Sequence, residues 1–317
     1  MRNSTINILI ASDINYAPYY GVMLSSLFET NQESSFDVYL ITDETWTEKE
    51  TKKFSTLCEK HHSRFIVNVT NVERMNTFPK STHINRATYF NLNAANILPT
   101  SVHKIIYMDG DMVVNGDIRP IWNFDIEGYA CAMVEDCSTY DQSIYDRLGY
   151  DKMYGFYNNG VTVYNMDFLR KMNFSEKALR FIAENPEKAL WMDQDAINFL
   201  LAEKTIGLPM MYNFQTLFLL DYHWKNYNDD FRSKVLEASM HPVVVHYAGR
   251  IKPWNWRYFG LPYKQEWNHY YDISSWKNAR VYKPLDKYIK HLIKRLLKRR
   301  YYLAMCQGEY ILESHNL

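Results

Sequence analysis

The chain has 317 residues, enough for one large domain or for a domain with an appendage, and its 36 basic and 36 acidic residues leave a formal net charge of zero. A hydrophobic fraction of 47% with 16% aromatic residues favours a globular protein over a disordered one. Four cysteines without metal-ligand spacing predict a reduced interior rather than a disulfide framework. The N-terminal apolar run is too short for a signal peptide and no run reaches membrane-spanning length, so we expect the body of the protein on the cytoplasmic side.

The N-terminal third alternates between strand-like and helix-like patterns. Three apolar runs are expected as strands, at Ile6–Ala11, Phe36–Asp43 and Arg64–Val69. Helices are expected between them, one with apolar positions Val22, Leu24, Leu27 and Phe28 and one over Glu48–His61, and a later helix over Thr88–Leu98. This alternation predicts an α/β fold with a parallel, doubly wound sheet, whose ligands bind at the carboxyl ends of the strands.

Two carboxylates one residue apart interrupt an apolar run at Lys104–Val114. In extended backbone Asp109 and Asp111 point the same way, and Gly110 places no side chain between them. Two close carboxylates need a cation, and hard oxygen ligands suit Mg²⁺ or Mn²⁺, which commonly carry a substrate's phosphates. The alternative is a solvated Asp-Gly-Asp turn. Because apolar residues flank the motif so closely, we favour a metal site.

A histidine follows a later apolar strand. Val243–Val245 precedes His246, so the imidazole is expected at a strand end, where it would be a third ligand beside the two aspartates. One nitrogen in an oxygen-rich site favours Mn²⁺ over Mg²⁺ modestly. Lys252 follows within reach of a diphosphate, with an ordinary surface lysine as the alternative, and Gly249 allows backbone to approach phosphates. Trp254 and Trp256 are expected to serve packing.

Polar side chains also follow the first predicted strand. Asp13, Asn15 and Tyr16 provide an acid, an amide and a phenol, which suit the polar edge and the flat face of a uracil ring. The alternative is a turn at the end of the strand, because Asp and Asn favour turns.

In this order the motifs resemble those of glycosyltransferase family 8, a family of retaining nucleotide-sugar transferases that includes bacterial lipopolysaccharide galactosyl- and glucosyltransferases. The resemblance extends from Ile6 to about His269. Four segments carry it: Ala11–Tyr16, Tyr107–Asp111, Tyr157–Val161 together with Trp191–Asp195, and His246–Trp254. It implies a single Rossmann-like GT-A nucleotide-sugar-binding domain with a mixed central sheet over residues 1–270, followed by a C-terminal helical extension over residues 271–317.

The resemblance also implies roles for single residues. Asp109, Asp111 and His246 are expected to bind the metal. The expected substrate-binding residues are Ala11, Asp13, Asn15 and Tyr16 for the nucleotide, Gly249 and Lys252 for the diphosphate, Asn158 for the donor sugar, and Asp136 near the acceptor. Asp193 is placed against the hydroxyls of the donor sugar and Gln194 below the anomeric carbon, and both are expected to be catalytic. The alternative for Asp193–Asp195 is a helix N-terminus with acidic residues in its first turn, and both interpretations can hold together.

The implied reaction is transfer of a hexose, glucose or galactose, from a UDP-sugar to a saccharide or lipid-linked saccharide acceptor in the synthesis of lipopolysaccharide or another surface glycan. The metal and Lys252 would neutralise charge on the departing UDP. Because the amide oxygen of Gln194 is a poor nucleophile, we favour front-face retention, in which the leaving phosphate helps to deprotonate the acceptor. Asp195 is expected as an available carboxylate nearby, which leaves a two-step route open.

Two other functions stay open at this stage. A metal-dependent phosphohydrolase is one, although Val113 stands where a common type has a hydroxyl residue. A catalytically silent nucleotide-sugar-binding protein is the other, because the family usually has Arg where Asn91 stands. Arg86 lies five residues earlier and is the candidate to compensate, so the identity of the donor is open.

The C-terminal segment differs in charge from the rest. Ten of the 36 basic residues lie between Lys277 and Arg300, with Asp286 as the single acid. Pro284 is expected to open a basic amphipathic helix with apolar positions from Leu285 to Leu296, which predicts peripheral binding to the anionic inner face of a membrane. The alternative is a terminal helix packed on the body. Nucleic acid is a less favoured partner, because no recognition motif accompanies the charge.

Overall fold

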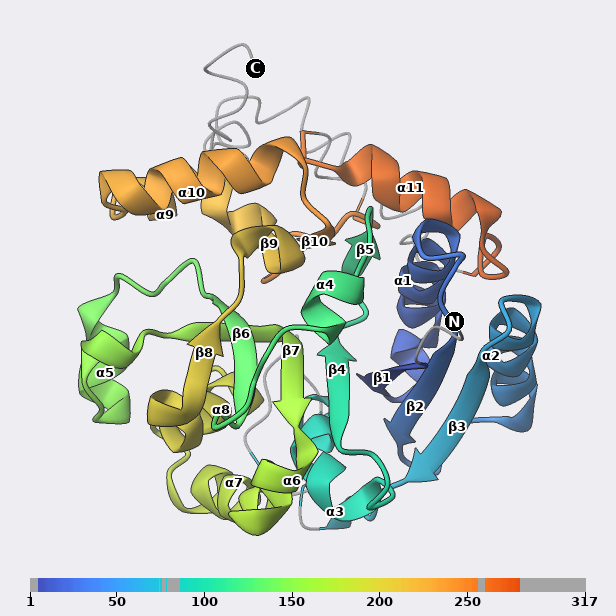
Figure 1. The fold of residues 1–317 in the computed structure, drawn as a ribbon, viewed down its shortest axis with the longest axis horizontal. Coiled ribbons are helices and arrows are strands. Elements are labelled where there is room, and N and C mark those ends of the chain that lie inside the picture. The colour runs from blue at the N-terminus through green and yellow to red at the C-terminus, as the bar shows by residue number, and fades with distance from the viewer. Residues whose placement is uncertain (1–4, 74, 76–77, 79–85, 256–259, 280–317) are drawn as a thin grey trace, which may run out of the picture.

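The computed structural model describes residues 5–73, 75, 78, 86–255 and 260–279 (Figure 1). A seven-stranded sheet with the order β3-β2-β1-β4-β7-β6-β8 forms its centre. The strands are β1 (Ile6–Ala11), β2 (Phe36–Thr42), β3 (Arg64–Val69), β4 (Lys104–Met108), β6 (Cys131–Glu135), β7 (Tyr157–Asn165) and β8 (Thr205–Gly207). The α/β class predicted from the sequence is therefore confirmed.

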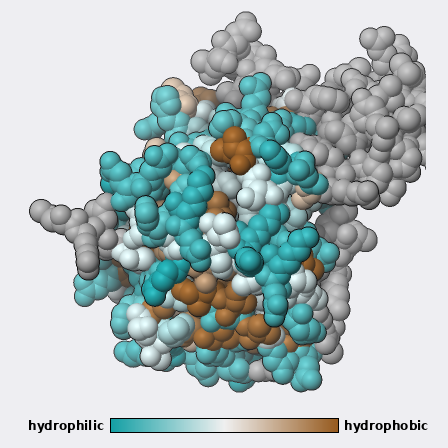
Figure 2. All heavy atoms as spheres, turned by 90° about the vertical axis from the view of Figure 1, so that its right-hand side faces the viewer, coloured by the Kyte–Doolittle hydropathy of each residue, from teal (hydrophilic) through white to brown (hydrophobic). Residues whose placement is uncertain are grey.

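The segment from residue 6 to residue 69 has the predicted elements. β1 pairs in parallel with β2 and β4, and β2 pairs in parallel with β3. Helix α1 (Ala17–Thr30) has Pro18 in its first turn, where the missing N–H costs nothing, and Thr47 caps α2 (Glu48–Lys60) by accepting from the Glu50 amide. β3 forms the edge of the sheet with exposed and half-buried residues. Figure 2 shows the molecule from the right-hand side of Figure 1, and this face is largely hydrophilic, with a larger apolar area in its lower part and a smaller one near its top.

The predicted helix over Thr88–Leu98 is wrong as one α-helix. The structure has a 3₁₀ segment, η3 (Arg86–Asn93), followed by a single α-helical turn, α3 (Ala94–Ile97). The consecutive residues Tyr89, Phe90 and Asn91 are all buried. An amphipathic α-helix buries one stripe only, so this segment departs from the regular helical spacing on which the prediction relied.

The sheet is mixed, as the family resemblance implied, and not fully parallel. β7 runs antiparallel to both β4 and β6, whereas β6 pairs in parallel with β8. Because of this reversal, the start of β7 lies beside the end of β4. Asn158, Asn159 and Gly160 are thereby brought next to Asp109.

A second, three-stranded sheet has the order β5-β10-β9 and was not predicted. Its strands are β5 (Met112–Val114), β9 (Phe214–Gln215) and β10 (Val244–His246). β10 is antiparallel to β5, with His246 opposite Met112, and parallel to β9, with His246 opposite Gln215. The small sheet therefore holds the histidine beside the Asp-Gly-Asp segment.

Helices cover both ends of the molecule. In Figure 1, α10 (Asp229–Met240) and α11 (Lys264–Ile273) lie at the end with the small sheet, and α3, α6 (Met166–Lys171) and α7 (Phe174–Glu184) lie at the opposite end. The other helices are α4 (Arg119–Trp122), α5 (Gln142–Leu148), α8 (Asp193–Leu201), α9 (Asp221–Trp224), and the 3₁₀ segments η1 (Ile14–Tyr16), η4 (Lys152–Tyr154), η5 (Ala202–Lys204), η6 (Met210–Asn213) and η7 (Thr216–Leu219). None of the helices in the described ranges has the length and apolar character needed to cross a bilayer.

The chain beyond residue 270 begins by packing on the domain. α11 continues across the predicted boundary, and Trp276 is 1% exposed, with its ring centroid 4.5 Å from that of Phe54 in α2. A Cβ at Gly21 of α1 would lie 2.3 Å from the Trp276 ring, so glycine is required there. We therefore propose that the extension begins after residue 279. The predicted basic helix, Cys306 and Trp256 lie outside the described residues.

Candidate active site

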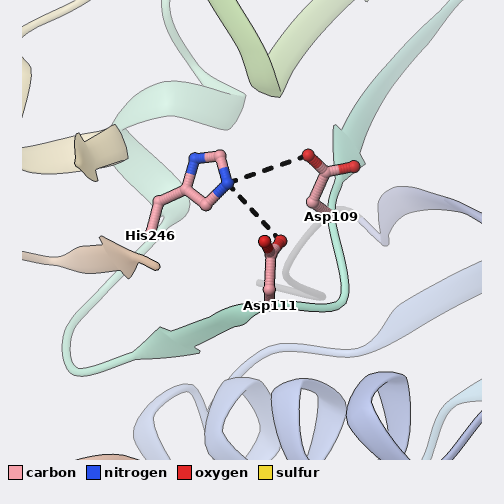
Figure 3. Close-up of side chains that lie close together, drawn as sticks. All are labelled: Asp109, Asp111 and His246. Carbon is pink, nitrogen blue, oxygen red and sulfur yellow. Dashed lines mark ion pairs between the residues drawn. The ribbon is translucent and has the colours of Figure 1, made fainter. Parts of the chain in front are cut away.

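Three metal-ligand side chains converge where the two sheets meet (Figure 3). Asp109 follows β4, Asp111 precedes β5, and His246 ends β10. The His246 Nε2 atom lies 3.4 Å from Asp111 Oδ1 and 3.9 Å from Asp109 Oδ2. One ligand atom from each residue lies within 4.8 Å of the other two. Two carboxylates and one imidazole at this spacing fit a single divalent cation.

Backbone hydrogen bonds hold the two aspartates between the sheets. The Asp109 amide donates to the Gly160 carbonyl at 2.9 Å, and the Tyr247 amide donates to the Asp111 carbonyl at 2.9 Å. A Cβ at Gly160 would lie 2.4 Å from His246 Cε1. The glycine therefore provides the space that the imidazole occupies. Gly160 belongs to a predicted motif, but the sequence alone assigned it no role.

The two carboxylates have different partners. Lys252 Nζ forms an ion pair with Asp111 Oδ2 and donates to the Tyr247 carbonyl at 2.8 Å. Tyr107 donates its hydroxyl to Asp109 Oδ1 at 2.5 Å. Burial and the charge of Asp111 raise the pKa of Asp109. For Asp111 burial acts in the same direction, but the charges of Lys252 and His246 outweigh it and hold its pKa below the usual range.

A chain of hydrogen bonds leads from His246 through Asn213 to Asn158. His246 Nδ1 lies 2.9 Å from Asn213 Oδ1, and Asn213 Nδ2 donates to Asn158 Oδ1 at 2.9 Å. Asn213 ends η6 and is fully buried. The sequence does not point to this residue, because nothing in its local pattern distinguishes it from other polar residues near a turn.

Asp136, Asn158 and Gln194 meet in one cluster, although Asp136 belongs to none of the four segments that carry the family resemblance. Asp136 Oδ2 accepts hydrogen bonds from Asn158 Nδ2 at 3.0 Å and from Gln194 Nε2 at 3.1 Å. Asn158 Nδ2 also donates to Gln194 Oε1 at 3.2 Å. All three side chains are buried. The structure therefore brings these three predicted site residues together, and their roles towards donor and acceptor stay predictions.

Asp193, the first residue of α8, is held by two amides. Its Oδ2 atom accepts from Asn91 Nδ2 at 2.7 Å and from Asn159 Nδ2 at 2.5 Å. Burial raises the pKa of Asp193 to about 7, and the negative charge of Asp109 adds to this effect. Asn91, which stands where the family usually has Arg, supplies a neutral partner. The side chain of Arg86 lies outside the described part.

Asp195 is not the available carboxylate that the sequence predicted. Arg147 Nη1 and Nη2 donate to its two oxygens at 2.7 and 3.0 Å, and the Trp191 amide donates to Oδ2 at 2.7 Å. Asp195 is 0% exposed. Because both oxygens are occupied inside the fold, the residue is part of a structural ion pair.

The segment after β1 lies beside the Asp-Gly-Asp motif. Asp13 Oδ1 accepts from the Asn15 and Tyr16 amides at 3.0 and 3.3 Å, so the aspartate forms the turn considered as the alternative. A Cβ at Gly110 would lie 3.1 Å from the Tyr16 ring, which places this ring against the motif. The Ala11 carbonyl accepts from the Tyr20 hydroxyl at 3.0 Å.

Two residues of the His246–Trp254 segment have clear local roles. Trp254 stacks on Tyr19 with ring centroids 3.9 Å apart, which confirms the packing role predicted for it. Gly249 has a φ of +73°, a conformation that glycine adopts without strain.

A pocket of about 240 Å³ opens beside Asp136. Its walls come from the chain between Cys137 and Gln142 and from Tyr222, His223 and Asn226. The sequence does not predict this pocket, because its two wall segments are distant along the chain and lie together only in the folded protein.

Comparisons with known proteins agree with this architecture. The model of glycosyl transferase family 8 matches residues 7–257. The lipopolysaccharide 1,2-glucosyltransferase of Escherichia coli (strain K12) is 27% identical over 308 residues, which cover 96% of this chain and 87% of the relative. General stress protein A of Bacillus subtilis (strain 168) is 28% identical over 292 residues, covering 87% and 96%. The crystal structure of galactosyltransferase LgtC with donor and acceptor sugar analogues shares the fold, with a TM-score of 0.77 at 19% identity, over 86% of this chain and 99% of that one.

Proposed function

The chain belongs to glycosyl transferase family 8, and on this premise we propose that it is a retaining hexosyltransferase that moves glucose or galactose from a UDP-sugar to a saccharide acceptor. The observation that carries the proposal is the convergence of Asp109, Asp111 and His246 beside Lys252. The buried amides and carboxylates that would receive the sugar lie beside this centre.

The donor's diphosphate would lie at the metal centre. Asp109, Asp111 and His246 would hold the cation, and their single nitrogen among oxygens favours Mn²⁺, with Mg²⁺ as the alternative. Such a cation, when bound, supplies Lewis-acid stabilisation of the phosphate charge. Lys252 adds a positive charge at the same place, because its Nζ already lies on Asp111. The nucleotide would lie along Asp13, Asn15 and Tyr16.

The sugar would lie against Asp193, Asn158 and Gln194. Asp193 Oδ2 accepts hydrogen bonds from the side-chain amides of Asn91 and Asn159. These bonds fix the orientation of the carboxylate, which would then contact hydroxyl groups of the donor. Gln194 is a poor nucleophile, and the ion pair of Asp195 with Arg147 argues against Asp195 as its substitute. We therefore favour front-face retention, in which the leaving phosphate takes the proton of the acceptor hydroxyl.

The acceptor would bind beside Asp136. The adjacent pocket combines polar groups with the ring of Tyr222, a residue that is 74% exposed, and such rings offer a flat face to a sugar. The relatives that act on lipopolysaccharide suggest a saccharide or lipid-linked saccharide of a surface glycan. The basic segment between Lys277 and Arg300 would hold the enzyme peripherally at the inner, cytoplasmic face of the membrane where such acceptors are made.

The direct test is to incubate the protein with UDP-glucose or UDP-galactose and Mn²⁺ and to measure UDP release. We expect UDP from one donor, and loss of this activity in the Asp109→Asn variant, which keeps the shape of the side chain. Release of inorganic phosphate instead would indicate a phosphohydrolase. UDP from neither donor, with Mn²⁺ bound as measured by electron paramagnetic resonance, would contradict the proposal and favour a binding protein.

A further inference from the structure

One continuous chain of side-chain hydrogen bonds joins the metal centre to the cluster formed by Asp136, Asn158 and Gln194. It runs from His246 Nδ1 to Asn213 Oδ1 at 2.9 Å, from Asn213 Nδ2 to Asn158 Oδ1 at 2.9 Å, and from Asn158 Nδ2 to Gln194 Oε1 at 3.2 Å. Asn158 Nδ2 and Gln194 Nε2 both donate hydrogen bonds to Asp136 Oδ2. The members come from five different elements or loops of the fold, so the chain exists only in the folded protein.

We propose that Asn213 is a positioning residue, which couples the orientation of His246 to the orientation of Asn158 and Gln194. The inference rests on the proposed function, because it assigns Asn213 to that same site. Asn213 is 0% exposed and His246 is 3% exposed. Because these groups are buried, each hydrogen bond favours one orientation of the next side chain.

The direction of the chain follows from what each atom can donate or accept. Asn213 Oδ1 can only accept, so the hydrogen bond requires a proton on His246 Nδ1 and leaves Nε2 to face Asp109 and Asp111, where it would bind the cation. Asn213 Nδ2 can only donate, so it selects the oxygen of Asn158. The Asn158 amide group must then face Gln194 and Asp136. The chain ends at the Asp136 carboxylate, because it accepts hydrogen bonds from both remaining donors, Asn158 Nδ2 and Gln194 Nε2.

Asparagine is the residue that this position requires. Aspartate in its place would still accept from His246, but it has no proton to donate and would repel Asn158 Oδ1. Asn158 would then have two choices. It could keep its orientation, in which its Oδ1 accepts from the Gly160 amide at 3.1 Å, or it could reverse its side-chain amide and lose the hydrogen bond to Gln194. Leucine, of similar size, would remove both contacts. The two substitutions therefore separate the histidine side of the coupling from the amide side.

The experiment compares the Asn213→Asp and Asn213→Leu variants with the wild type, all three with residues 1–317. Affinity for Mn²⁺ alone is measured by electron paramagnetic resonance, and turnover is measured as UDP release from the donor that the wild type uses. For Asn213→Asp we expect Mn²⁺ affinity within about threefold of wild type and kcat lower by about 10- to 100-fold. For Asn213→Leu we expect both quantities to fall by about 10- to 100-fold. Asn31→Asp is the matched control, because Asn31 is a buried asparagine that donates to the Leu27 and Gly116 carbonyls instead; it should leave both quantities unchanged.

A second measurement does not depend on turnover. Ring ¹⁵N shifts of His246 in the metal-free wild type should report a proton on Nδ1, and this proton should move towards Nε2 in Asn213→Leu. An Nδ1 atom without a proton in the wild type would overturn the inference, and so would wild-type kcat in folded Asn213→Asp. If the wild type releases UDP from neither donor, the proposed function fails, whereas the ring shifts and the Mn²⁺ affinities still decide the role of Asn213.

Discussion

Arg147 holds both carboxylate oxygens of Asp195, at 2.7 and 3.0 Å, in an ion pair whose acid is fully buried. On this basis we propose that the carboxylate next to Gln194 in sequence does not serve as a nucleophile. Removing one partner of a buried pair leaves an uncompensated charge, which typically costs about 3–5 kcal/mol.

We therefore expect Arg147→Met to lower the free energy of unfolding by about 3 kcal/mol, as measured by urea denaturation. Asp195→Asn should retain turnover within a few-fold of wild type at temperatures where the variant is folded. An Asp195→Asn variant with wild-type stability and no transfer activity would show that Asp195 takes part in the chemistry.

Gly160→Ala tests the space behind the metal ligand. The added Cβ would lie 2.4 Å from His246 Cε1 and 2.7 Å from Met112 Cε, so the imidazole must move. We expect Mn²⁺ affinity, measured by electron paramagnetic resonance, to fall by about 10- to 100-fold. Gly207→Ala is the matched control, because a Cβ there meets no atom within 4 Å. Equal affinities in the two variants would contradict the role given to Gly160.

Asp193 makes stability depend on pH. Its pKa in the folded chain is about 7, above the unfolded value, so the folded state holds this proton longer and stability falls as pH rises through this interval. Asp193→Asn stays neutral, so its stability relative to metal-free wild type should increase by roughly 2–3 kcal/mol between pH 5 and pH 8. Urea denaturation at both pH values measures this difference, and a difference that does not change with pH would refute it. Turnover should be lost in the same variant.

Deleting residues 280–317 tests the proposed membrane contact. The deletion removes all but one of the basic residues between Lys277 and Arg300 and keeps Trp276, which packs on Phe54 and Gly21. We expect the shortened protein to lose co-sedimentation with anionic liposomes and to keep UDP-sugar hydrolysis. A deletion from residue 274 onwards also removes Trp276 and should cost about 3–5 kcal/mol of stability, as loss of a buried Trp does. Unchanged co-sedimentation after the shorter deletion would reject the membrane contact.

The sequence by itself determined the elements and motifs whose signal is local. The strands β1 to β3, the helices α1 and α2, and the shared direction of Asp109 and Asp111 all follow from spacing within a few residues, so pattern alone predicted them. The motif order likewise predicted the family and the mixed sheet. Tertiary structure alone decided which distant groups meet: the ion pair of Asp195 with Arg147, the place of Asn213 behind His246, and the small sheet that holds the histidine. These contacts depend on strand direction and on packing between segments far apart in the chain, and no local spacing records them.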